Sequence, residues 1–559
     1  MEESPAVGFE WNIAAIAHAI ESVVPAHDAI VWRDLRLTWR DVGERSRRLA
    51  GALADRGFGL RRTFEECEPW ESPHDHVALY LYNGNEYLEA TLAAHQARCA
   101  PINVNYRYRS TELHHVLSDS AAAVVIYGGS FAETLAAVRD DLPDLGLLVQ
   151  VDDGSGARLL DGAIGYEDLL SRHAPTLPPG LVDSWSPDDR YICYTGGTTG
   201  LPKGVVWRQG DFLQAALGIG VGRDWSGYDD LAAAASHSSL RALPTPPLMH
   251  GAAMWNALSC WAAGGAIILQ DDTHHLDPAD VWSSVERHGA TSLLIVGDAF
   301  ARPLIDEWDA HGGYDVPTLR HILSGGAVLS PTVKQGLVER LPEIAIVDVL
   351  GSTESGRQGV ATSRVGATSA GFTPESSAVV LSEDRSRVLG PSDDAIGWLA
   401  QSGRVPLGYL GDAETTRTAF TRVGDLRCAI AGDRARHRAD GSIELLGRDS
   451  VTINTGGEKV FAEEVETALK AHPAVFDALV CGRPSLRWGQ EIVGVVALRD
   501  GVRVEADELR RWCRRDLADF KAPKAIVFVP AVVRSPSGKA DYRWARDTAE
   551  RAAPEGHAR

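Results

Sequence analysis

The chain has 559 residues, with 44% hydrophobic and 23% charged side chains and a formal net charge of −21. These proportions are typical of a globular protein with large cores, and they exclude collagen-like, disulfide-scaffold and wholly disordered chains. The negative charge also argues against nucleic acid as a partner, because binding to the phosphate backbone requires a basic face.

Targeting and redox features point to a cytoplasmic protein. The N-terminus, MEESPAVGFEWN, has no basic segment, so we expect no secretory signal. The best apolar run, Ala262–Leu269, is far shorter than the ~20 residues that cross a bilayer, so we expect no membrane span. The seven cysteines are scattered without a C-x-x-C pair, which favours a reduced cytoplasm.

The first 447 residues alternate short β-branched runs with amphipathic helical stretches. Capping residues mark both ends of one predicted helix: Asp277 and Pro278 supply the N-cap and the first turn, and Gly289 ends it. This alternation predicts an α/β fold with buried sheets. The predicted strands are Val77–Tyr82, Ala123–Tyr127, Arg190–Tyr194, Ala266–Leu269, Ser292–Val296 and Ala345–Leu350.

The pattern restarts near Arg448, where the charge balance also changes. From Arg448 onward 19 Lys and Arg face 17 Asp and Glu, so the preceding 447 residues carry all of the net negative charge. We expect a large N-terminal domain of βα sheets, residues 1–447, and a small α+β C-terminal domain, residues 448–559. The predicted elements of the small domain are helices at Ala462–Ala471 and Glu505–Leu517 and strands at Ala478–Val480 and Ile492–Leu498.

The segment Tyr194–Gly204, YTGGTTGLPKG, is the most informative for chemistry. Four glycines, three threonines and Lys203 follow a predicted strand, so bare N–H groups, hydroxyls and a cation can face one anion. The segment lacks the G-K-[ST] of a P-loop, which disfavours P-loop kinase or GTPase chemistry. We interpret it as a phosphate-binding loop.

This loop resembles the signature loop of the adenylate-forming superfamily, which contains acyl-CoA synthetases, peptide-synthetase adenylation domains and firefly luciferase. The resemblance implies that family's fold, with a large α/β domain and a small mobile α+β lid that pivots near Arg448–Ser450. Seven further segments resemble other motifs of the family, in the family's order: Pro247–Gly251, Ser324–Ala327, Gly351–Glu354, Gly432–Asp433, Gly447–Arg448, Gly456–Val460 and Pro536–Lys539.

The resemblance also implies cofactors and residue roles. ATP, Mg²⁺ and coenzyme A are the expected cofactors; Lys539, His250 and Glu354 are the expected catalytic residues, and Glu354 is the expected Mg²⁺ ligand. Asp433 is implied to bind the ribose hydroxyls. The expected nucleotide and coenzyme A contacts are Thr195, Gly196, Gly197, Thr198, Thr199, Gly200, Lys203, Gly325, Gly326, Ala327, Leu350, Gly351, Ser352, Thr353, Asp433, Arg448, Gly456, Gly457 and Lys459.

The implied reaction has two steps. A substrate carboxylate attacks the α-phosphorus of ATP and releases pyrophosphate, so fixed cations must meet the charge that develops. The lid then withdraws Lys539, and the coenzyme A thiolate displaces AMP from the acyl-adenylate. A basic cluster in the tail is the expected place for coenzyme A phosphates, although such a run is also typical of a solvated helix face: Arg510, Arg511, Arg514, Arg515, Lys521 and Lys524.

Four segments resemble, more narrowly, actinobacterial acyl-CoA ligases of steroid side-chain acids: Lys203–Arg208, Gly297–Leu304, Ile453–Val460 and Ser535–Trp544. This implies a bulky steroid or diterpenoid acid as the carboxylic acid substrate, in lipid metabolism or antibiotic biosynthesis. The pocket residues expected for that acid are Met254, Trp255, Gly297, Asp298 and Gly325, although Trp255 is also compatible with the core.

The chain departs from the family pattern at a few positions. Leu350 stands where the family often has a tyrosine stacked on adenine, Ala431 replaces the threonine of T-G-D, and Ser450 replaces the usual Asp or Lys of the hinge. Loss of one aromatic contact costs ~0.5–1.5 kcal/mol, which weakens nucleotide binding without abolishing it. The segment Phe58–Pro73 is longer than the usual linker and resembles a surface loop without an assigned function.

Three alternatives to a complete acid–CoA ligase stay open at this point. The enzyme could form the thioester from preformed acyl-AMP while adenylating poorly, although the presence of Lys539 argues against this. It could instead load a carrier protein, or it could bind nucleotide without catalysis. The sequence also leaves open whether the chain forms a homo-oligomer.

Overall fold

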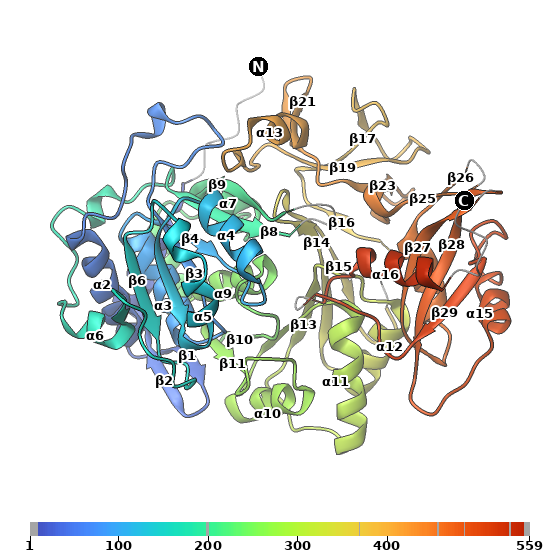
Figure 1. The fold of residues 1–559 in the computed structure, drawn as a ribbon, viewed down its shortest axis with the longest axis horizontal. Coiled ribbons are helices and arrows are strands. Elements are labelled where there is room, and N and C mark those ends of the chain that lie inside the picture. The colour runs from blue at the N-terminus through green and yellow to red at the C-terminus, as the bar shows by residue number, and fades with distance from the viewer. Residues whose placement is uncertain are drawn as a thin grey trace.

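The structure is a computed structural model that describes residues 9–196, 201–367, 369, 371–455, 458–485, 487–535 and 538–552. Figure 1 shows several sheets with flanking helices in the first four-fifths of the chain. The last hundred residues form a separate group of elements beside helices α11 (Gly297–His311) and α12 (Pro331–Arg340). We call this last group the lid and the preceding elements the body.

The largest sheet of the body has nine strands in the order β16-β15-β14-β13-β12-β10-β11-β1-β2. Its six central strands are parallel, so the segments that follow β12, β13 and β14 meet at one edge of the sheet. The strands are β1 (Asp28–Trp32), β2 (Leu35–Thr38), β10 (Arg241–Pro244), β11 (Ala266–Leu269), β12 (Ser292–Ile295), β13 (His321–Gly325), β14 (Ala345–Ser352), β15 (Gly356–Ser363) and β16 (Thr373–Pro374).

Two further sheets complete this side of the body. A parallel sheet of order β4-β3-β5-β6-β7 has every residue of β3, β5 and β6 buried, as expected when helices cover both faces. A three-stranded antiparallel sheet has the order β20-β9-β8. The strands are β3 (His76–Tyr80), β4 (Ala100–Asn103), β5 (Ala122–Gly128), β6 (Leu147–Val151), β7 (Ile164–Gly165), β8 (Arg190–Thr195), β9 (Lys203–Arg208) and β20 (Gly408–Tyr409).

Helices surround these sheets (Figure 1). The largest apolar core lies between the parallel five-stranded sheet and the helices of the first hundred residues, with Trp11, Trp39 and Tyr87 buried in it. The remaining body helices are α1 (Ile13–Val23), α2 (Trp39–Asp55), α3 (Asn85–Gln96), α4 (Ser110–Asp119), α5 (Ala132–Ala136), α6 (Tyr166–Ser171), α7 (Gln209–Ala215), α8 (Tyr228–Ala235), α9 (Gly251–Ala262) and α10 (Pro278–His288).

A smaller, mostly antiparallel sheet connects the body to the lid. Its path is β18-β17-β19-β22-β21, and β23 joins β19 to β24, the last strand before the lid. Its elements are β17 (Ala378–Leu381), β18 (Val388–Leu389), β19 (Gly397–Ser402), α13 (Ala413–Ala419), β21 (Phe420–Val423), β22 (Leu426–Ala429), β23 (Asp433–His437) and β24 (Ile443–Arg448).

The lid has its own core and its own sheet. Its sheet has the order β26-β25-β28-β27, with β29 parallel to β28, and its buried apolar cluster is drawn from residues 451–549. The elements are β25 (Ile453–Thr455), β26 (Glu458–Val460), α14 (Ala462–Lys470), β27 (Val475–Ser485), β28 (Gly489–Leu498), α15 (Ala506–Cys513), β29 (Ala525–Val529) and α16 (Tyr542–Arg551). Short 3-10 turns occur at Phe64–Glu66, Gly129–Phe131, Arg139–Asp141, Val182–Ser184 and Asp449–Val451.

The structure confirms the predicted α/β class and most of the predicted elements. Helix α10 starts after the N-cap Asp277, whose side chain accepts two backbone N–H groups, and ends at Gly289 with φ of 62°. The two lid strands are longer than predicted, because they form one hairpin of eleven and ten residues. Helix α15 stops at Cys513, earlier than predicted, and turns continue the chain from there.

The last two features are the apolar length of the helices and the state of the cysteines. Among the helices within the described ranges, none is long and apolar enough to cross a membrane. All seven cysteines are free, and six of them are buried.

Candidate active site

The expected nucleotide residues gather at the edge where the parallel strands end. Gly325 ends β13 and is followed by Gly326 and Ala327, while Gly351 and Ser352 end the neighbouring β14. Gly351 is required by a close approach, since a Cβ there would lie 2.2 Å from the Gly356 carbonyl oxygen. Leu350 is 8% exposed and packs into the apolar cluster of the small sheet, so its side chain belongs to that core.

Glu354 follows this edge in the turn between β14 and β15. The Tyr409 hydroxyl donates to Glu354 Oε1 at 3.3 Å, and the Trp207 indole N–H donates to the Thr353 carbonyl at 3.0 Å. A Cβ on Gly251, at the start of α9, would lie 3.6 Å from Thr353 Oγ1. The G-S-T-E turn is therefore fixed between β9, β20 and α9.

The phosphate-loop residues are placed in part. Thr195 ends β8 and Lys203 begins β9, so the two strands bring both ends of the loop together in direct register. Lys203 Nζ donates to Asp412 Oδ2 at 2.7 Å and to Thr415 Oγ1 at 2.8 Å. Gly196 is described and exposed, whereas Gly197, Thr198, Thr199 and Gly200 lie outside the described residues.

Asp412 is the anchor of this lysine. Its side chain caps helix α13 by accepting the Thr415 N–H at 2.9 Å. Although burial opposes the shift, hydrogen bonds from Lys203 and Thr415 lower the pKa of Asp412 to about 2. The carboxylate is thus ionised at neutral pH and holds the ammonium of Lys203.

His250 is the N-cap residue of α9 and lies near Lys539 and Arg107. Its Nε2 is buried and, within the described residues, has no hydrogen-bond partner. Burial lowers the pKa of His250 to about 3, and the nearby cations Lys539 and Arg107 act in the same direction. The ring is therefore neutral and can offer one nitrogen to a bound group.

Asp433 and Arg448 form the border between the body and the lid. They are directly opposite in the β23–β24 register, and Arg448 Nε lies 3.3 Å from Asp433 Oδ1. The Arg448 backbone N–H donates to Glu463 Oε1 of α14 at 3.2 Å. Burial and the Glu466 carboxylate raise the pKa of Glu463 to about 7, and its second oxygen is buried without a partner in the described residues.

Lys539 reaches this site from the lid. A Cβ on Gly326 would lie 4.0 Å from Lys539 Cε. The lysine keeps solvent contact in the open cleft, yet protein groups surround its ammonium; this enclosure and the charge of Arg448 lower its pKa, whereas Glu354 and Asp433 oppose the shift.

The loop that carries Lys539 is anchored inside the lid. Arg534 makes two hydrogen bonds of 2.7 Å to the Asp477 carboxylate and a third, of 3.2 Å, to the Gly538 carbonyl. The Ser535 N–H donates to the Lys539 carbonyl at 2.8 Å. Gly538 packs against Phe300 of α11, since a Cβ there would lie 3.0 Å from that ring.

The expected coenzyme A residues are less well placed. Lys459 of β26 is exposed and lies 3.7 Å from Glu383, and Gly456 and Gly457 lie outside the described residues. In the basic cluster of the tail, Lys521 donates to both oxygens of Glu464 at 2.7 and 2.8 Å, and Arg510 pairs with Asp507 at 2.8 Å. These two cations already have carboxylate partners.

The expected acid-pocket residues fall into two groups. Met254 is 6% exposed in the main core, and the Trp255 indole N–H donates to the Tyr191 hydroxyl at 3.0 Å. Gly297 has φ of 55° at the start of α11, where a Cβ would lie 2.4 Å from the Val328 carbonyl oxygen. Asp298 accepts the Ser330 N–H at 2.7 Å.

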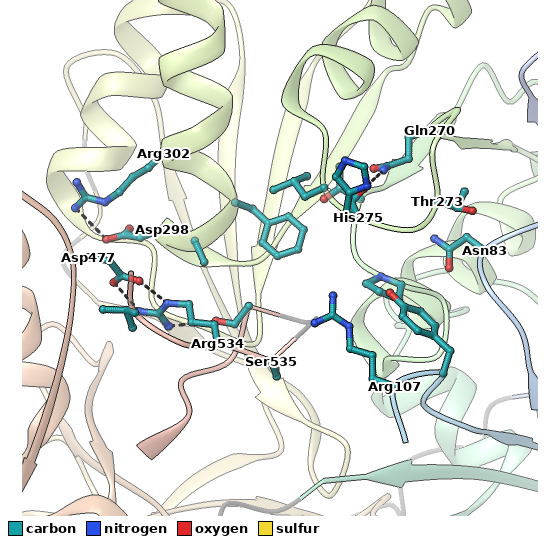
Figure 2. Close-up of a pocket in the computed structure, with 18 of the residues that line it drawn as sticks. Asn83, Arg107, Gln270, Thr273, His275, Asp298, Arg302, Asp477, Arg534 and Ser535 are labelled. Carbon is teal, nitrogen blue, oxygen red and sulfur yellow. Dashed lines mark hydrogen bonds and ion pairs between the residues drawn. The ribbon is translucent and has the colours of Figure 1, made fainter. Parts of the chain in front are cut away.

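A cavity of about 320 Å³ lies between the body and the lid (Figure 2). The body contributes Asn83, Arg107 and Phe300, and the lid contributes Arg534 and Ser535. His275 lines it as well, whereas Met254 and Trp255 do not belong to its lining. Arg107 points across the cavity, and sequence reasoning missed it because no motif surrounds it.

Two further functional residues were missed by sequence reasoning. Tyr409 and Asp412 hold Glu354 and Lys203, respectively, and both lie more than fifty residues from the side chains that they contact. Their segment, Gly408–Asp412, contains a glycine and an N-cap, which predict a turn before a helix. No local pattern predicts the partners.

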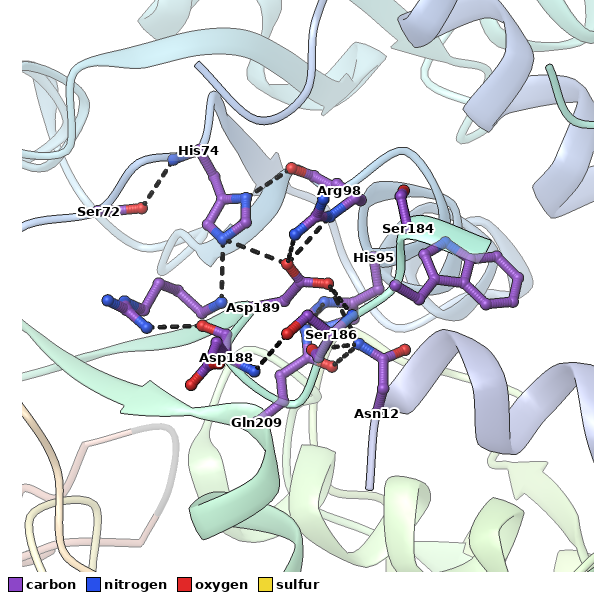
Figure 3. Close-up of polar contacts among 12 residues, drawn as sticks. Asn12, Ser72, His74, His95, Arg98, Ser184, Ser186, Asp188, Asp189 and Gln209 are labelled. Carbon is purple, nitrogen blue, oxygen red and sulfur yellow. Dashed lines mark hydrogen bonds and ion pairs between the residues drawn. The ribbon is translucent and has the colours of Figure 1, made fainter. Parts of the chain in front are cut away.

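A buried polar network fixes the far end of β8 (Figure 3). Asp189 accepts from Arg98 at 2.6 Å and from Asn12 at 3.2 Å, and His74 Nε2 accepts the Arg190 N–H at 3.2 Å. Burial lowers the pKa of His74 to about 3, so the neutral ring can accept this bond. At ~3.3 Å per residue, roughly 17 Å of strand separates this network from Thr195, and we assign it a structural role.

The arrangement fits a metal carried by a nucleotide. Within the described ranges, no group of three or more His, Cys, Asp and Glu side chains is placed to hold a metal ion. Mg²⁺ bound with a polyphosphate takes most of its oxygen ligands from phosphate and water and needs only one or two carboxylates. Glu354, a hard oxygen donor at the open edge, is a suitable protein ligand.

Comparison with known proteins gives a consistent result. The family model for AMP-binding enzymes matches residues 19–404, and the model for the AMP-binding enzyme C-terminal domain matches residues 464–539. The chain is 47% identical to the medium-chain acyl-CoA ligase Mig of Mycobacterium avium, over 96% of this chain and 98% of that protein. It is 37% identical to a 3-oxocholest-4-en-26-oate–CoA ligase of Rhodococcus rhodochrous, over 96% of this chain and 95% of that protein.

Solved structures show the same fold. The anthranilate CoA ligase AuaEII in complex with anthranoyl-AMP matches with a TM-score of 0.81 and 21% identity, over 97% of this chain and 98% of that one. ATP-bound MatB from Rhodopseudomonas palustris matches with a TM-score of 0.77 and 22% identity, over 96% and 99%. At these identities the likeness concerns the fold alone.

Proposed function

The chain belongs to the family of AMP-binding enzymes, among its acyl-CoA ligases, and on that premise we propose that it joins a hydrophobic carboxylic acid to coenzyme A at the expense of ATP. One observation carries the proposal. Residues from distant segments come together: Lys539 lies near His250, Glu354 and Asp433, and Lys203 lies 5.6 Å from the ring of Tyr409, whose hydroxyl donates to Glu354. That convergence supplies cations and a metal ligand where a nucleotide would lie.

In the first step, a carboxylate oxygen of the acid attacks the α-phosphorus of ATP, and the bond to the pyrophosphate leaving group breaks. Lys539 offers its charge to the α-phosphate, and Lys203 offers its charge to the departing phosphates. Mg²⁺ held by Glu354 would neutralise phosphate charge and orient the polyphosphate. Asp433 accepts hydrogen bonds from the ribose hydroxyls.

In the second step, coenzyme A loses its thiol proton to solvent, the thiolate attacks the acyl carbonyl carbon, and AMP leaves with the electron pair of the mixed anhydride bond. We propose that residues 448–559 rotate as a unit about Arg448–Ser450, so that Lys539 withdraws and the β25–β26 hairpin approaches. The separate core of the lid supports this division, since few side chains need to change partners inside either part. The neutral His250 stays in the body during both steps.

Two substrate classes have support. The resemblance to steroid-acid ligases and the 37% identical relative favour a bulky steroid or diterpenoid acid, bound near Gly297, Asp298 and Gly325. The 47% identical relative, named as a medium-chain acyl-CoA ligase, favours a medium-chain fatty acid. Both are hydrophobic monocarboxylic acids, so the same adenylation chemistry serves either one.

A substrate screen tests the function and separates the two classes. Purified enzyme with ATP and Mg²⁺ would be offered medium-chain fatty acids, a steroid side-chain acid and a diterpenoid acid, each with and without coenzyme A. We expect pyrophosphate release and acyl-CoA formation in equal amounts with at least one class. Nucleotide binding without pyrophosphate release for every acid would contradict the proposal and favour a non-catalytic role.

The same screen addresses the other open alternatives. Thioester formation from supplied acyl-AMP, without pyrophosphate release from ATP, would identify an enzyme specialised for the second step. Transfer to a holo-carrier protein, without transfer to free coenzyme A, would identify a carrier-loading enzyme. We also propose a cytoplasmic location, where ATP and coenzyme A are available and free thiols persist.

A further inference from the structure

The contact between the body and the lid contains a buried arginine with no part in the chemistry described above. Arg302 of α11 is 6% exposed. Its Nη2 donates to the carbonyl of Lys470, in the lid, at 3.2 Å, and lies 3.3 Å from Asp298 Oδ2, one helical turn earlier in α11. Its Nε is buried without a hydrogen-bond partner in the described residues.

The acceptor of this bond is well suited to a cation. Lys470 is the last residue of α14, and the carbonyls of a last helical turn lack intrahelical partners and carry partial negative charge. A guanidinium that donates to such a carbonyl makes a charge-assisted hydrogen bond. The bond is buried, so water competes for it only weakly.

Away from the hinge at Arg448, two other pairs between body and lid are more exposed. Arg499 of the lid lies 3.4 Å from Asp306 of α11, with side chains 38% and 48% exposed, and Lys459 lies 3.7 Å from the exposed Glu383. Exposed pairs of this kind contribute little to stability. The Arg302 contact therefore has the stronger hold on the orientation of the lid.

Figure 2 shows the lid residues that lie beside this contact. Asp298 and Arg302 face Asp477 and Arg534 of the lid across one end of the cavity. Asp477 follows α14 by seven residues and binds Arg534, which in turn holds the carbonyl before Lys539. The end of α14 and the lysine loop thus belong to one rigid segment of the lid.

We infer that Arg302 is a positioning residue that holds the lid in the orientation in which Lys539 enters the nucleotide site. It is specific for the adenylation step, because rotation of the lid removes the Lys470 carbonyl while Asp298, in the body, stays with Arg302. This inference rests on the proposed two-step reaction.

The test compares the two half-reactions in Arg302→Gln. Adenylation is followed as pyrophosphate release from ATP and acid, and the second step as thioester formation from supplied acyl-AMP and coenzyme A. We expect kcat for adenylation to fall about tenfold or more, as for loss of a hydrogen bond to a charged group. We expect thioester formation to change by less than about twofold, and Arg302→Lys to restore part of adenylation.

Two further variants control for stability and exposure. The double variant Asp298→Asn/Arg302→Gln leaves no uncompensated buried charge, so it keeps the test valid if Arg302→Gln folds poorly. Because Asp298 is also proposed to lie near the acid, the double variant is compared with Asp298→Asn alone, and we expect the same division between the half-reactions in that comparison. Arg499→Ala, which removes the exposed contact to Asp306, should leave both half-reactions nearly unchanged.

The orientation itself can be measured with spin labels at Asp306→Cys and Arg499→Cys, because six of the seven native cysteines are buried. With ATP bound, we expect most molecules to show the short distance between the two labels. In Arg302→Gln, we expect a smaller fraction of molecules to show it. Equal loss of both half-reactions in the double variant relative to Asp298→Asn, or an unchanged distance distribution, would overturn the inference. If the parent enzyme releases no pyrophosphate with any acid, the proposed function fails, and the distance measurement still decides the role of Arg302.

Discussion

Two regions deliver a lysine to the same site, and they do so differently. Lys203 belongs to the body, where Asp412 and Thr415 bind its ammonium at 2.7 and 2.8 Å. Lys539 belongs to the lid, and the charges that act on it, from Glu354, Arg448 and Asp433, come from segments outside its own loop. One cation is built into the site, and the other is brought to it.

The difference teaches how one site can serve two reactions. A cation with a carboxylate partner in its own part of the protein stays in place whatever the lid does. A cation in the lid whose partners belong to the body leaves those partners when the lid moves. Enclosure by protein groups and the charge of Arg448 lower the pKa of Lys539 in this position of the lid.

Removal of the delivered lysine is the strongest way to sharpen this contrast. We expect Lys539→Ala to lower pyrophosphate release about 10²- to 10³-fold, as for loss of a preorganised group at developing charge. Thioester formation from supplied acyl-AMP should stay within about twofold, because we propose that Lys539 is withdrawn in that step. Arg551→Ala, at the exposed end of α16, is the matched control and should change neither rate.

Removal of the partner of the built-in lysine should have a smaller and different effect. In Asp412→Asn, we expect pyrophosphate release to fall about tenfold, because Lys203 loses a charged hydrogen-bond partner. We also expect the free energy of unfolding to fall by up to about 1 kcal/mol, because the ion pair with Lys203 is lost while Asn keeps the N-cap of α13. Thermal unfolding measures this, with Lys539→Ala as the comparison, because that variant should leave stability unchanged. Equal stability of Asp412→Asn and Lys539→Ala would contradict the difference between the two lysines.

The long loop Phe58–Pro73 should also affect the site of Lys203, the lysine held within the body. The Trp70 carbonyl accepts the Gly411 N–H at 2.9 Å. The Trp70 Cβ packs against Gly408, since a Cβ added there would lie 3.2 Å from it. The Trp70 ring also lies 5.9 Å from the guanidinium of Arg417 in α13, the helix that Asp412 caps, so we expect Trp70→Ala, which removes the ring, to lower adenylation by about threefold. Trp70→Phe should restore the rate; loss of adenylation without restoration would point to a general folding defect.

The smallest expected effect concerns pH. The pKa of His250, lowered to about 3 by burial and by nearby cations, lies far below the usual 6.5. The ring therefore stays neutral as pH falls from 8 to 5, and adenylation should show no inflection from His250 in that range. Comparison of the pH–rate profiles of the parent enzyme and His250→Gln checks this; an inflection near pH 6.5 that disappears in the variant would contradict it.

Much of the site was predictable from local patterns. Gly351 and Gly297 lie where neighbouring backbone leaves no room for a Cβ atom. Asp277 and Gly289 mark the two ends of helix α10, as an N-cap and as a residue with positive φ. The order of the motifs, compared with the family, implied that distant segments meet.

Other parts depend on contacts that no local pattern contains. Tyr409 and Asp412 bind side chains far away in the sequence, and Arg302 donates to a backbone carbonyl 168 residues later. Leu350 stands at the expected position, but its side chain packs into the core of a sheet that sequence reasoning did not predict. Such partners are set by how the sheets and the lid pack, which the composition of one segment does not encode.

A single-turnover experiment is the most direct test of a site that adenylates first and transfers second. Enzyme in excess over the acid would be mixed with ATP and Mg²⁺ without coenzyme A, quenched and assayed for acyl-AMP, and a second portion would receive coenzyme A before quenching. We expect bound acyl-AMP and pyrophosphate in equal amounts in the first portion, and acyl-CoA and AMP in the second. Pyrophosphate release only when coenzyme A is present, with no acyl-AMP in the first portion, would contradict it.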